Sequence, residues 1–131
     1  MDRDDPPAAV VAAVEQSLRL STPAHLDSPV EWVRTRAWQW DAAKHEGAPQ
    51  RFVGWDREIY VIRLRGQFTK LRPRSPRGPG PAVVYSVSEQ FVMVEAEGAE
   101  AGRVFGGAHG WIIDMAELGR VHTFDYAAAK G

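Results

Sequence analysis

The spacing of apolar residues predicts one helix near the start of the chain. Between positions 6 and 20, apolar side chains recur every three or four residues, which places them on one face of a helix. They are Val10, Val11, Val14 and Leu18. Pro6 suits the first turn of a helix because its missing N–H has no partner there, and the Ser21-Thr22-Pro23 sequence ends the pattern. We therefore predict a helix over residues 6–20.

Residues 30–113 show the alternation of period two that is typical of strands. Residues 30–40 are rich in β-branched and aromatic residues, and residues 58–68 alternate more regularly. In the latter segment Tyr60, Ile62, Leu64 and Phe68 share one face, and Arg63 and Arg65 share the other. Further strands are predicted over residues 82–96 and from about Arg103. Because consecutive strands with short connections favour antiparallel pairing, we expect a meander of about four strands.

Two segments lie outside this strand pattern. Residues 70–81 contain four prolines, two glycines and four cations, so we expect a long exposed hairpin loop. Residues 114–131 begin with Asp114 and Glu117 at the spacing of a capping box, and Gly119 follows as a stop. That spacing predicts a short helical turn followed by a tail.

These elements predict a single α+β domain over residues 1–131. Its N-terminal helix packs on a roughly four-stranded antiparallel meander sheet, and a short C-terminal helical turn follows. With 44% hydrophobic and 25% charged residues, the 131-residue chain has the composition of an ordinary globular domain. No apolar run approaches the roughly 18 residues that cross a bilayer, so no transmembrane segment is expected.

The residues needed for common chemistries do not occur in the required patterns. The chain has no cysteine, and none of its four histidines has a partner at metal-ligand spacing. Phosphate-binding glycine loops, dinucleotide fingerprints and nucleophile elbows are also missing from the sequence. We expect no catalytic residues, no bound metal and no cofactor.

The most distinctive surface feature is a basic segment in an otherwise acidic chain. Residues 51–80 carry a net charge of +6, residues 1–50 a net charge of −3, and residues 81–131 a net charge of −4. The candidate partner-binding cations are Arg63, Arg65, Lys70, Arg72, Arg74 and Arg77. Prolines keep such a segment extended, so its charges are presented to an acidic partner at little entropic cost. The alternative is a solvated loop whose charges only prevent aggregation at a sheet edge. No nucleic-acid-binding motif accompanies the segment, so a specific nucleic acid is not expected.

Tryptophan is the second candidate for binding. Trp38 and Trp40 are candidates for an exposed aromatic surface that binds a partner, since tryptophan is frequent at interface hot spots. The alternative is that their rings fill the core. Pairing of two chains through a sheet edge also stays open.

Part of the sequence resembles a known group of domains. A strand over residues 59–68, a proline-rich loop, a second strand and a glycine turn over residues 95–104 resemble the PepSY-like and cystatin-like arrangement of small secreted or lipoprotein-type proteins from GC-rich bacteria. The resemblance extends from about Ala8 to Phe124 and implies a non-catalytic fold outside the cytoplasm. The Gln-x-Val-x-Gly hairpin of cystatins is missing from the sequence, so protease inhibition is not implied.

Three functions remain open on this basis. The first is a non-catalytic interaction or regulatory module of the bacterial cell envelope or secreted space, whose export signal precedes this chain. The second is a small enzyme or ligand binder of α+β-cone type, with a pocket lined by Trp38, Trp40, Tyr60 and a histidine. The third is a cytoplasmic adaptor that binds an acidic protein through the basic loop.

Overall fold

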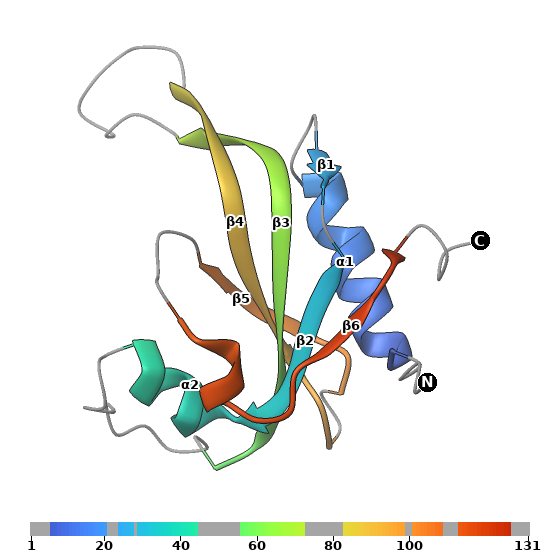
Figure 1. Cartoon of the computed structure of the whole chain (residues 1–131), viewed down its shortest axis with the longest axis vertical. Helices are drawn as coiled ribbons and strands as arrows, with labels where there is room; N and C mark the ends of the chain where they lie inside the picture. The colour runs from blue at the N-terminus through green and yellow to red at the C-terminus, as the bar shows by residue number, and fades with distance from the viewer. Residues whose placement is uncertain are drawn as a thin grey trace.

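The computed structural model describes residues 6–20, 24–27, 29–44, 56–72, 83–98, 101–108 and 113–126. The elements in chain order are α1 (Ala8–Leu20), β1 (Ala24–Leu26), β2 (Val30–Arg36), α2 (Ala37–Lys44), β3 (Glu58–Arg72), β4 (Val83–Glu95), β5 (Val104–Ala108), the 3₁₀ turn η1 (Met115–Glu117) and β6 (His122–Phe124). Figure 1 shows α1 lying across one face of a curled sheet. The prediction of an α+β fold with one main helix and an antiparallel sheet is confirmed.

The sheet is built around the long strand β3. Its order is β5-β4-β3-β2-β6, and β1 pairs with β3 beyond the end of β2. The four strand pairs in this order and the pair of β1 with β3 are all antiparallel. Strands β2 to β5 form the predicted meander. The two short strands β1 and β6 are additions that the sequence pattern did not predict.

The helix α1 forms where it was predicted, beginning two residues after Pro6. The carbonyl of Pro7 accepts hydrogen bonds from the amides of Val10 and Val11, which closes the first turn. Val10 and Val14 are fully buried against the sheet. Their stripe therefore has the role that its spacing indicated.

Both faces of the sheet are buried, and β3 supplies both cores. On the α1 face, Tyr60, Ile62, Leu64 and Phe68 all belong to one hydrophobic cluster, as predicted. On the opposite face a second cluster forms under α2 and η1. Its members are Val33, Ala37, Trp40, Ile59, Val61, Phe91, Met93, Ile113, Met115 and Leu118. The sequence pattern predicted a core on the α1 face only.

The C-terminal turn confirms one prediction and corrects another. Asp114 accepts a hydrogen bond from the amide of Ala116 at 3.0 Å and begins η1, as its spacing predicted. The segment after it is not merely a tail, because His122–Phe124 pairs with β2 as strand β6. Three residues are too few for a period to be recognised, and the strand exists only because β2 offers an edge.

Candidate functional site

The chain turns from strand to helix at residues 36 and 37, where a continuous strand was predicted. The side chain of Gln39 accepts hydrogen bonds from the Thr35 hydroxyl at 2.9 Å and from the Arg36 amide at 3.1 Å. The Ala37 amide donates to the Arg57 carbonyl at 3.0 Å. These contacts satisfy amides at the start of α2, as a capping box does. The predicted strand over residues 30–40 is therefore wrong after Arg36.

Because α2 is a helix, its two tryptophans face different surroundings. Trp40 is 1% exposed and packs against Phe91, with ring centroids 5.5 Å apart. Trp38 is 44% exposed, and no other large hydrophobic residue is exposed in the part of the chain that the structure describes. The proposed aromatic surface thus loses Trp40, which is a core residue, and retains Trp38.

The residues suggested for an aromatic pocket do not come together. Trp40 belongs to the cluster beneath α2, whereas Tyr60 belongs to the cluster beneath α1 on the other face. Tyr60 instead meets Trp32 edge-on, with centroids 5.7 Å apart, and Trp32 stacks on His122 at 4.3 Å. This geometry gives no support to a pocket lined by Trp38, Trp40 and Tyr60.

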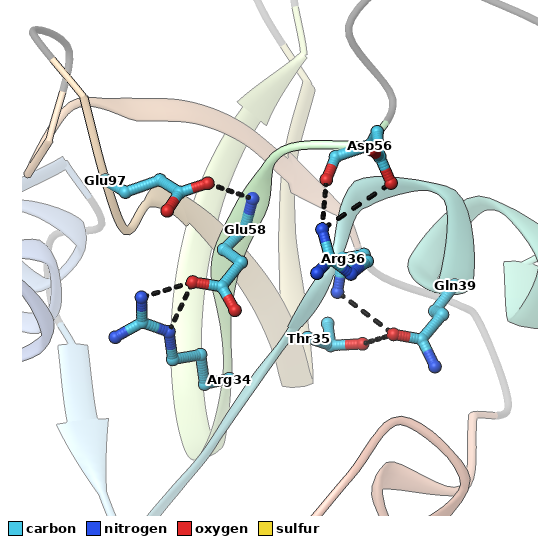
Figure 2. A network of polar contacts seen from close by, with 7 residues as sticks. All are labelled: Arg34, Thr35, Arg36, Gln39, Asp56, Glu58 and Glu97. Atoms are coloured by element: carbon cyan, nitrogen blue, oxygen red, sulfur yellow. Dashed lines mark hydrogen bonds and ion pairs between the residues drawn. The ribbon is translucent and has the colours of Figure 1, made fainter.

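A network of polar side chains joins the ends of β2, β3 and β4 (Figure 2). Arg34 donates to the Glu58 carboxylate through Nε at 3.1 Å and also through Nη2. The Glu58 amide in turn donates to Glu97 at 3.3 Å. The hydrogen bond from Arg34 lowers the pKa of Glu58 below its usual value, and the same bond raises the pKa of Arg34.

The second half of this network holds Arg36. Its guanidinium donates to the Asp56 carbonyl at 2.7 Å and lies 3.5 Å from the Asp56 carboxylate. Since each arginine of the network faces a carboxylate, the network stabilises the junction of strands. It offers no concentrated charge of one sign.

Two of the predicted partner-binding cations are likewise paired with carboxylates. Arg63 lies directly opposite Glu31 and forms an ion pair with it, and both side chains are less than 20% exposed. Arg65 lies opposite Glu89, with Arg65 Nε 3.2 Å from the carboxylate, and Arg65 Nη1 is 3.8 Å from Glu31. Arg63 and Arg65 therefore neutralise local carboxylates and do not add to the positive charge of the loop.

Of the four remaining predicted cations, two lie at the end of strand β3 and two lie outside the described residues. Lys70 and Arg72 are in strand β3, where they pair with Tyr85 and Val83 of β4. The predicted loop over residues 70–81 is thus shorter at its start, because β3 continues to Arg72. Arg74 and Arg77 lie outside the described residues.

Past the pair Phe68 and Val87, toward the hairpin end, β3 and β4 have no other strand of the described chain beside them. β1 pairs with β3 only up to Phe68, and β5 pairs with β4 only from Phe91 onward. Residues 69–72 and 83–86 therefore form a two-stranded ribbon, which we call the arm. Figure 1 shows the arm rising past the ends of β2 and β5.

The histidines that the structure describes are dispersed. His25 is exposed on β1, and His122 stacks on Trp32. His45 and His109 lie outside the described residues. Within the described ranges, no group of three or more His, Asp or Glu side chains is arranged to hold a metal ion. None of the helices in these ranges is long and apolar enough to cross a membrane.

Sequence reasoning missed the carboxylates that pair with Arg63 and Arg65. Glu31 and Glu89 are 32 and 24 residues away from their partners. The only signal available was that acidic and basic residues occur on strands predicted to be neighbours.

Comparison of the chain with models of protein families, with curated proteins and with solved structures found no match.

Proposed function

We propose that this protein is a non-catalytic interaction module that binds an acidic protein partner through the arm. The observation that carries the proposal is the concentration of positive charge in the segment of sequence that contains the arm. Residues 66–88 contain four cations and no carboxylate, although the whole chain has a net charge of −1. The cations are Lys70, Arg72, Arg74 and Arg77.

The shape of the arm supports the same proposal. A two-stranded ribbon buries little apolar surface and is marginally stable alone, so a projecting ribbon adds little to the stability of the fold. It does extend a basic surface away from an acidic body. Such a surface steers an acidic partner to one end of the molecule.

The finer assignment remains part of this proposal. A PepSY-like or cystatin-like domain of the cell envelope or secreted space agrees with a helix lying across a curled antiparallel sheet. The placement outside the cytoplasm rests on the resemblance of the sequence alone. An adaptor inside the cell would use the same arm.

Binding of a ten-glutamate peptide, measured by fluorescence anisotropy, tests the proposal. We expect the double variant Lys70→Ser/Arg72→Ser to bind it about tenfold more weakly, because each exposed ion pair contributes about 0.7 kcal/mol. We also expect the affinity of the unmodified protein to fall as salt is raised. The control is Arg103→Ser/Arg120→Ser, which changes net charge equally at exposed positions beside β5 and β6.

Two outcomes would contradict the proposal. One is an equal loss of affinity in the control variant, which would show that only net charge matters. The other is tighter binding of duplex DNA or of phosphatidylglycerol vesicles than of the glutamate peptide, because the arm would then serve a different class of partner.

A further inference from the structure

We draw no further inference here: the strongest candidate, the surface patch at the exposed Trp38 of α2, rests on a single exposed ring, and nothing in the described residues shows what covers it.

Discussion

The carboxylate of Glu58 makes stability depend on pH. Because Arg34 lowers the pKa of Glu58 in the folded protein, the pair stabilises the fold above the pKa of the unfolded chain. The stabilisation is lost as pH falls through the lowered folded value. We expect Glu58→Gln to be less stable than the unmodified protein at pH 7, and the difference to shrink below about pH 4.

Urea unfolding at a series of pH values measures this difference. The exposed residue Glu117 provides a control, since Glu117→Gln removes a carboxylate of η1 that is not one of the seven residues of the network in Figure 2. A Glu58→Gln deficit that stays constant from pH 7 to acid pH would mean that charge is not its cause.

Gly66 is required by the close approach of β1 to β3. A Cβ atom at Gly66 would lie 1.8 Å from the carbonyl oxygen of His25, which is backbone and cannot move alone. At Gly98, where φ is +80°, a Cβ would meet nothing within 4 Å. We expect Gly66→Ala to lower the free energy of unfolding by about 3 kcal/mol and Gly98→Ala by about 1 kcal/mol. Similar losses in the two variants, measured by urea unfolding, would refute the steric explanation.

At the scale of elements, α2 assigns opposite roles to two tryptophans that are two residues apart. We expect Trp40→Ala to cost about 3–5 kcal/mol, since it empties the core beside Phe91. Trp38→Ala should cost much less, about 1 kcal/mol, because its side chain is 44% exposed. Denaturant unfolding of both variants checks this, and a large loss in Trp38→Ala would show that its ring is structural.

The elements that sequence predicted are those that long periodic segments determine. The stripe of α1 and the alternation of β3 each extend over many residues, so their patterns are unambiguous. The segment over residues 37–40 has aromatic residues at period two, which is typical of a strand. A side-chain cap from Gln39 and a carbonyl from distant Arg57 make it a helix instead.

The candidate site was predictable only in part for a related reason. The charges of the arm can be read directly from the sequence. The end of α1 and the turn at Asp114 can also be predicted from it. Whether an arginine is neutralised depends on strand register, which places Glu31 opposite Arg63 and Glu89 opposite Arg65. Nor can sequence show that, among the described residues, the pairing of β5 with β4 reaches only from Val94 to Phe91.

At the scale of the whole molecule, β3 belongs to two structurally different parts of the sheet. Its first half lies in both cores and is flanked by β2 and β4. Its second half leaves the body with β4 as the arm, in which a bulge between Arg65 and Phe68 marks the change. The body therefore contains both hydrophobic cores, and under the proposed function the arm meets the partner.

This division predicts that the arm and the body respond separately to mutation. If these cations serve a partner, as proposed, Lys70→Ser/Arg72→Ser should change the free energy of unfolding by less than about 0.5 kcal/mol. A circular-dichroism melt of this variant should therefore match that of the unmodified protein. A melting temperature lowered by many degrees would mean that these cations are structural.

The most direct test of the account is a nitrogen-15 NMR titration with the ten-glutamate peptide. We expect the amide shifts that change with peptide to lie in residues 69–72 and 83–86, and those of α1 and α2 to stay constant. Shifts that cluster around Trp38 on α2, or that spread evenly over all exposed cations, would contradict the claim that the arm is the binding surface.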